Sequence, residues 1–163
     1  MKKWMKMTAT MMVAAMALTA CGGNDAADDS ADAGETYTVG IIQQLEHPAL
    51  DQATKGFEDK LTELLGDKVK FDYQNAQGEQ ANCATIANNF VAGNYDLILA
   101  NATTALQCSA AATSTIPILG TSVTDYATAL EIDDWTGSTG RNISGTSDLA
   151  PLDEQEAMIK ELF

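Results

Sequence analysis

Amide, hydroxyl and carboxylate side chains follow four short apolar runs of this sequence, and these groups are well suited to bind a ligand. Hydroxyls and the free N–H groups at the start of a helix can hold a carboxylate, whereas an acidic side chain can hold an ammonium. The combination suits a small zwitterion. The alternative is that no site exists, because polar loops are usual at strand ends. The four groups are Gln43, Gln44, Glu46 and His47; Gln74, Asn75 and Gln77; Asn101, Thr103 and Thr104; and Thr121, Ser122, Thr124 and Asp125.

A hydrolytic site is the other chemistry to consider, and it would have to use His47, the only histidine. Ser122 or Ser147 would be the nucleophile, but neither lies in a Gly-x-Ser-x-Gly sequence. The simpler interpretation of His47 is a helix-entry residue beside Pro48. We therefore expect no catalytic residue and no enzyme. A single histidine and the lack of a Cys-x-x-Cys sequence also predict no metal site, and nothing in the sequence calls for a cofactor.

The spacing of apolar residues predicts alternating strands and helices. Residues 37–42 form a continuous apolar run, which is typical of a strand covered on both faces. Apolar positions from Leu50 to Leu64 are three and four residues apart, as on one face of a helix. The predicted strands are 37–42, 69–73, 97–100, 116–119 and 142–147, and the predicted helices are 48–64, 79–92, 104–114 and one that begins at Pro151, with 125–134 ambiguous.

This series of elements predicts an α/β domain in which a parallel sheet has helices on both faces. Right-handed crossovers and an alternating, wetter second strand favour the flavodoxin-like strand order 2-1-3-4. In such a sheet, ligands bind beyond the carboxyl ends of the strands, which is where the four polar groups lie. The helices at 79–92 and 104–114 would share one face of the sheet.

A bacterial lipobox at residues 18–21 (Leu-Thr-Ala-Cys) ends a short secretory signal. The apolar stretch before it is shorter than the roughly 20 residues that a spanning helix needs. We expect residues 1–20 to be a signal peptide and Cys21 to carry the lipid, since two or three acyl chains anchor a protein stably. The alternative is an ordinary signal peptide with a chance cysteine. The lipobox predicts an extracytoplasmic protein that is lipid-anchored to the bacterial cell membrane.

The chain beyond Cys21 is strongly acidic. The formal net charge of the whole sequence is −14 at pH 7, and three of its nine basic residues precede Cys21. This charge argues against nucleic acid as a partner and against adsorption on anionic lipid. Residues 22–35 contain no side chain more apolar than alanine, so we expect residues 21–35 to be a disordered acidic tether. The remainder is long enough for one domain.

A set of short segments matches a known family in the same order along the chain. The segments are 39–43 (VGIIQ), 46–51 (EHPALD), 56–57 (GF), 72–78 (DYQNAQG), 96–98 (DLI), 116–118 (IPI), 124–125 (TD) and 142–148 (NISGTSD). They resemble the substrate-binding lipoproteins of ABC transporters, of the tryptophan and tyrosine uptake type. The resemblance implies a type I periplasmic-binding-protein fold, with residues 36–149 as the N-terminal ligand-binding lobe and residues 150–163 as the truncated start of a second lobe.

The resemblance also implies a function. The chain would be the extracytoplasmic solute-binding component of an ABC importer, which captures a small ligand for delivery to a membrane permease. The implied ligand is an amino acid, with aromatic amino acids as one option. An extracytoplasmic hydrolase and a truncated, non-binding remnant lipoprotein are the alternatives. The ligand-binding candidates are Gln44, Glu46, Thr103, Thr104, Ser122, Thr124, Asp125, Ser147 and Asp148.

Several of the acidic and hydroxyl residues have a structural role as an alternative. Asp125 can contact a ligand or form a turn, and Thr103 and Thr104 can contact a carboxylate or cap a helix. Glu46 and Asp51 could pair with a ligand ammonium, but a carboxylate at Asp51 also favours the first turn of its own helix. The sequence leaves these alternatives open.

Two cysteines, Cys83 and Cys108, remain once Cys21 is assigned to the lipid. An extracytoplasmic pair can be oxidised, and both lie in early turns of helices that we place side by side on one face of the sheet. We therefore expect a disulfide between them. The alternative is a pair of buried, reduced cysteines that act as small apolar residues.

Overall fold

The computed structural model describes residues 36–162. The predicted signal peptide, the lipid-bearing Cys21 and the acidic tether lie outside the described residues, so they stay predictions. Among residues 36–162, no helix is both long and apolar enough to cross a bilayer. The same residues contain no group of histidine, cysteine and acidic side chains arranged to hold a metal ion.

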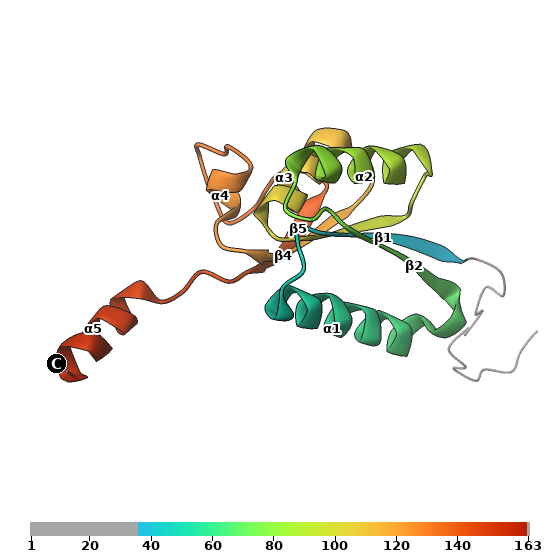
Figure 1. The fold of residues 1–163 in the computed structure, drawn as a ribbon. Helices are drawn as coiled ribbons and strands as arrows, with labels where there is room; N and C mark the ends of the chain where they lie inside the picture. Colours follow the sequence, from blue (N-terminus) through green and yellow to red (C-terminus); the bar gives the residue numbers. More distant parts are fainter. Residues whose placement is uncertain (1–35, 163) are drawn as a thin grey trace, which may run out of the picture. The chain divides into compact units, whose positions relative to one another are not determined.

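Five parallel strands form a single sheet in the order β2-β1-β3-β4-β5 (Figure 1). The predicted order 2-1-3-4 is confirmed, and the short fifth strand pairs with the outer side of β4. The first two strands run further than predicted, and the fourth is shifted towards the carboxyl side. The strands are β1 (Tyr37–Gln43), β2 (Val69–Asn75), β3 (Leu97–Asn101), β4 (Ile118–Val123) and β5 (Ile143–Ser147).

Helices cover both faces of this sheet. Figure 1 shows α1 on one face and α2 with α3 on the other, as predicted. The ambiguous segment 125–134 forms only the four-residue helix α4. The last predicted helix is present, and all of its described residues are exposed. The helices are α1 (Pro48–Leu65), η1 (Gly66–Lys68), α2 (Gln80–Ala92), α3 (Thr103–Ala112), α4 (Tyr126–Ala129) and α5 (Leu152–Leu162).

The core divides between the two faces because neighbouring strand residues point in opposite directions. Ile42 packs in the larger cluster with α2 and α3, which includes Phe90 and Leu106. Ile41 packs in the smaller cluster under α1, together with Leu99. Burial on both faces explains why β1 is one continuous apolar run in the sequence.

A buried hydrogen-bond network lies where β1 and β3 end beneath α1. Thr54 of α1 donates from Oγ1 to Gln43 Oε1 at 2.9 Å, and its Oγ1 accepts from Asn101 Nδ2, also at 2.9 Å. Asn101 Nδ2 also donates to the Leu50 carbonyl at 2.8 Å. Gln43 Nε2 donates to Asp51 Oδ1 at 2.6 Å. The network therefore fastens the first half of α1 to the carboxyl ends of two adjacent strands.

This network corrects the sequence analysis at two positions. Gln43 and Asn101 were grouped with the polar residues that could meet a ligand, but both side chains are fully buried and are register partners within the sheet. Asp51 has the structural role given as its alternative in the sequence analysis. It lies in the first turn of α1 and accepts a hydrogen bond from Gln43. Gln43 and Asn101 therefore position the edge of the sheet rather than face the solvent, whereas Asp51 is exposed.

Cys83 and Cys108 are both buried, one on α2 and the other on α3. They are free thiols in this structure, which corresponds to the reduced alternative rather than to the expected disulfide. The two helices do pack against each other on the same face of the sheet, as predicted.

Replacement of Thr54 by valine should destabilise the fold. The substitution keeps the shape of the side chain but removes the hydroxyl, which leaves Gln43 Oε1 buried without a donor. We expect the free energy of unfolding to fall by about 1–3 kcal/mol, measured by urea denaturation. Thr62→Val, on an exposed position of the same helix, is the matched control and should change it by no more than about 0.5 kcal/mol. Equal effects of the two substitutions would contradict the role of the network.

Candidate functional site

The start of α3 lies at the carboxyl end of β3 and has an unusual backbone. Its N-cap residue, Ala102, has φ 87° and ψ 164°, a region that non-glycine residues rarely occupy. Ala102 itself has no side chain that could cap this end of the helix. The Thr104 amide instead donates to Gln44 Oε1 at 3.3 Å, which brings the ends of β1 and β3 together. Gln44 therefore occupies one amide of the first turn, and the other N–H groups of a helix start attract anionic groups.

Thr103 and Thr104 are the first two residues of α3, and both are half-buried. Their alternative role as helix caps is wrong, because the N-cap is Ala102 and both threonines already have helical backbone. Their hydroxyls therefore belong to the first turn, beside its free N–H groups. This is the arrangement that contact with a carboxylate needs.

The adjacent strand β4 ends in a second unusual backbone segment. Ser122 has φ 55°, and the pairing of β4 with β5 shifts register between Gly120 and Val123. The Ala102 amide donates to the Thr121 carbonyl at 2.9 Å, so the two strained segments are directly connected. Strained backbone of this type is concentrated at binding sites, where the surrounding structure holds it in place.

Asp125 follows β4 and is the N-cap of α4. Its carboxylate accepts from the Thr128 hydroxyl at 2.6 Å and from the Ala127 amide at 2.9 Å. These hydrogen bonds, those from Thr128 first, hold the pKa of Asp125 below its ordinary value. The turn-forming role of Asp125 is therefore confirmed. The side chain is nevertheless exposed and ionised at neutral pH, so it also remains available to a cation.

Hydrogen bonds join the ends of β4 and β5. Ser147 Oγ donates to the Thr124 carbonyl at 2.8 Å, and the Asp148 amide donates to the Val123 carbonyl at 3.1 Å. The candidate residues at the ends of β4 and β5 are thus brought together. The side chains of Ser147 and Asp148 are exposed. Gln44 joins this edge through its contact with α3.

Glu46 and His47 lie at the entry to α1 and are both exposed. His47 is the N-cap of α1, and its Nδ1 accepts from the Ala49 amide at 3.2 Å. The interpretation of His47 as a helix-entry residue is confirmed. No hydrogen bond in the described part of the chain joins it to Ser122 or Ser147, the two serines considered as nucleophiles.

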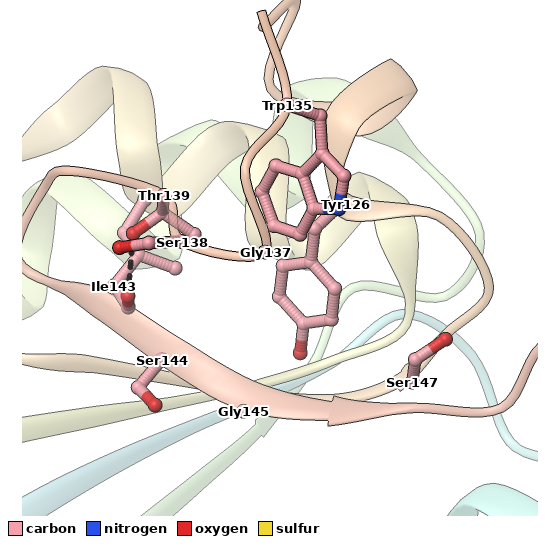
Figure 2. A pocket seen from close by; sticks show the side chains of 9 residues that line it. All are labelled: Tyr126, Trp135, Gly137, Ser138, Thr139, Ile143, Ser144, Gly145 and Ser147. Atoms are coloured by element: carbon pink, nitrogen blue, oxygen red, sulfur yellow. Dashed lines mark hydrogen bonds between the residues drawn. The ribbon is translucent and has the colours of Figure 1, made fainter.

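A cavity of about 260 Å³ lies along the outer strand β5, and the sequence analysis did not find it. Figure 2 shows the indole of Trp135 and the ring of Tyr126 on one side of it, above the β5 backbone. Trp135 is 43% exposed, whereas Tyr126 is buried and donates from its hydroxyl to the Thr146 carbonyl at 3.2 Å. The other lining residues are Gly137, Ser138, Thr139, Ile143, Ser144, Gly145 and Ser147.

Two glycines make room for Tyr126 in this cavity. Gly120 and Gly145 are register partners on β4 and β5, and a Cβ on either one would overlap the Tyr126 hydroxyl. Both glycines are visible in the sequence, but that they lie opposite each other and leave space for Tyr126 depends on the register of the two strands. The loop at 135–141 had been interpreted only as a glycine, serine and threonine loop, so the role of Trp135 was missed.

Comparisons with known proteins identify similar sequences. The family described as ABC transporter substrate binding protein matches residues 38–163. A tyrosine-binding protein of Clostridioides difficile is 38% identical over 153 residues, which cover 89% of this chain and 44% of that protein.

Solved structures agree with this match. An ABC domain in complex with L-Trp, from Streptococcus pneumonia, is 35% identical with a TM-score of 0.71 and covers 77% of this chain and 43% of its own. A conserved domain protein of Vibrio cholerae is 38% identical with a TM-score of 0.72 and covers 78% of this chain and 44% of its own. The chain therefore spans less than half the length of these relatives.

Proposed function

The chain belongs to the family of ABC transporter substrate-binding proteins, and from this premise we propose that it forms one wall of a receptor for an amino acid. In this proposal, residues 36–149 are the N-terminal ligand-binding lobe, and residues 150–163 begin a second lobe. The captured ligand passes to a permease in the membrane. The chain spans only 44% of the tyrosine-binding relative.

The start of α3 is the observation that carries the proposal. It combines a helix start whose N-cap residue has no capping side chain, two hydroxyl side chains at Thr103 and Thr104, and a backbone strained at Ala102. The helix has 10 residues, long enough for its dipole and free N–H groups to favour a bound anion. We assign the carboxylate of the ligand to this position, with Ser122 beside it on the next strand.

Acidic residues are suited to the ammonium group of the same ligand. Asp125 is exposed and its pKa is lowered, so it carries a negative charge at neutral pH. Glu46 and Asp148 are exposed acidic residues that follow β1 and β5 at the same edge. A carboxylate-binding helix start beside acidic side chains matches a zwitterion better than it matches a simple anion or cation.

An aromatic amino acid is the ligand that we favour. The printed descriptions of two relatives name tyrosine and L-Trp as what those proteins bind. Within this chain, Ser147 belongs both to the predicted edge and to the cavity beside Trp135 and Tyr126. An aromatic surface thus adjoins the residues that we assign to the ligand.

One lobe alone should bind weakly. A small ligand in half a cleft stays largely hydrated but still loses translational and rotational freedom. We expect the isolated chain to bind L-tryptophan and L-tyrosine no better than about millimolar, near −4 kcal/mol, as measured by calorimetry. A longer chain that continues into a second lobe should bind far more tightly. Micromolar binding by the short chain would contradict the division of the site between two lobes.

The same calorimetry tests the assigned position. In the longer chain, Thr104→Val should weaken binding by up to about tenfold, since one hydrogen bond contributes roughly 0.5–1.5 kcal/mol. Thr85→Val, at an exposed position on α2, is the matched control and should leave the affinity unchanged. An unchanged affinity in both variants would remove α3 from the site without removing the receptor function.

We also propose that Cys21 carries the lipid that anchors the receptor. The chain is too acidic to adsorb on anionic headgroups, so the lipid must supply the attachment. When expressed in bacteria, the Cys21→Ser variant should be lost from the membrane fraction or keep its signal peptide. Cell fractionation tests the first outcome and the intact mass tests the second. A variant that is still cleaved and still membrane-bound would contradict the lipobox.

A further inference from the structure

Two buried thiols lie on the neighbouring helices α2 and α3. Cys83 and Cys108 belong to one core cluster, and the helices that carry them pack directly together. Burial, followed by the neighbouring Cys108 thiol, raises the pKa of Cys83 to about 11. Burial also raises the pKa of Cys108, and a hydrogen bond with Cys83 lowers it by less. The geometry agrees with this, because Cys108 Sγ donates at 3.8 Å to the carbonyl of Gln80, which belongs to the same first turn of α2 as Cys83, and both thiols are free.

We propose that Cys83 and Cys108 are a redox-active pair that closes into a reversible disulfide between α2 and α3 by exchange with an external disulfide. In the first step, the minor thiolate form of Cys108 attacks one sulfur of the external disulfide and releases the other as a thiol. In the second step, the Cys83 thiolate attacks Cys108 in this mixed disulfide and releases the second thiol. The two cysteines are oxidised, the external disulfide is reduced to two thiols, and the two cysteine protons end on those thiols.

The surroundings make Cys108 the point of entry. Cys83 has no exposed surface, whereas Cys108 is 7% exposed and lines a cavity of about 230 Å³ on the outside of α2 and α3. Gln80 and Gln107 line the same cavity, and Cys108 Sγ donates to the Gln80 carbonyl at 3.8 Å. Access to one thiol and burial of the other define the order of attack and resolution.

The position of the pair gives the bond a structural consequence. Cys108 lies little more than one turn beyond Thr104, and Cys83 lies in the first turn of α2. A bond between them would join the two helices directly behind the edge that we assign to the ligand. It would close a loop of about 25 residues, which should raise the Tm by roughly 10 °C.

The test uses the full chain in a Cys21→Ser background, so that these are its only two thiols. The reduced protein is equilibrated in glutathione buffers of increasing oxidised fraction and then acid-quenched. We expect an intact mass lower by two hydrogens and a bridged peptide that contains both cysteines, reversed by excess reduced glutathione. Failure to form the bridge at any glutathione ratio would overturn the proposal. This outcome is independent of ligand binding.

Single-cysteine variants test the order of attack. In Cys83→Ala, the mixed disulfide cannot be resolved, so a glutathione adduct should accumulate on Cys108. In Cys108→Ala, the fully buried Cys83 should stay unmodified under the same conditions. Adduct formation on Cys83 at a comparable rate, in a variant whose circular dichroism is native, would overturn entry through Cys108. The bridge in the two-cysteine protein does not depend on whether these variants fold.

Discussion

The buried hydrogen-bond network of Gln43, Thr54 and Asn101 is the constraint on which the candidate site depends. These three polar side chains have no access to solvent or almost none, and the hydrogen bonds among them offset part of the cost of burying them, while Asn101 Oδ1 has no hydrogen-bond partner in the described part of the chain. Because Gln43 and Asn101 end adjacent strands and Thr54 belongs to α1, the network holds a helix and two strand ends in one geometry. Apolar side chains at these positions would also pack together, but they would not fix the orientation of α1 relative to the two strand ends as strictly.

The strained backbone of the site follows from this constraint. Asn101 is held by the network, and Ala102 comes next, so the positive φ of Ala102 is imposed between a fixed strand end and the start of α3. Its amide donates to the Thr121 carbonyl, which extends the constraint to β4 and to Ser122. The threonines at the start of α3 are therefore preorganised, and a ligand would not have to order them.

The sequence predicts the sheet order and the helix positions well because long apolar patterns determine both. It does not predict which of two adjacent glutamines is buried, since Gln43 is the last residue of β1 and Gln44 is the first residue after it. The caps at His47 and Asp125 were among the alternatives considered. The cavity at Trp135 and Tyr126 was missed because its shape depends on the pairing of two glycines that lie far apart in the sequence.

Mapping of amide chemical shifts by two-dimensional NMR tests the central claim most directly. L-Tryptophan would be added to the ¹⁵N-labelled chain up to the millimolar range in which one lobe is expected to bind. The account predicts that the largest shift changes occur in the first turn of α3 and in the segment from Ser122 to Asp125. Changes confined to residues 135–139 and β5, or no change at α3 under saturating conditions, would contradict it.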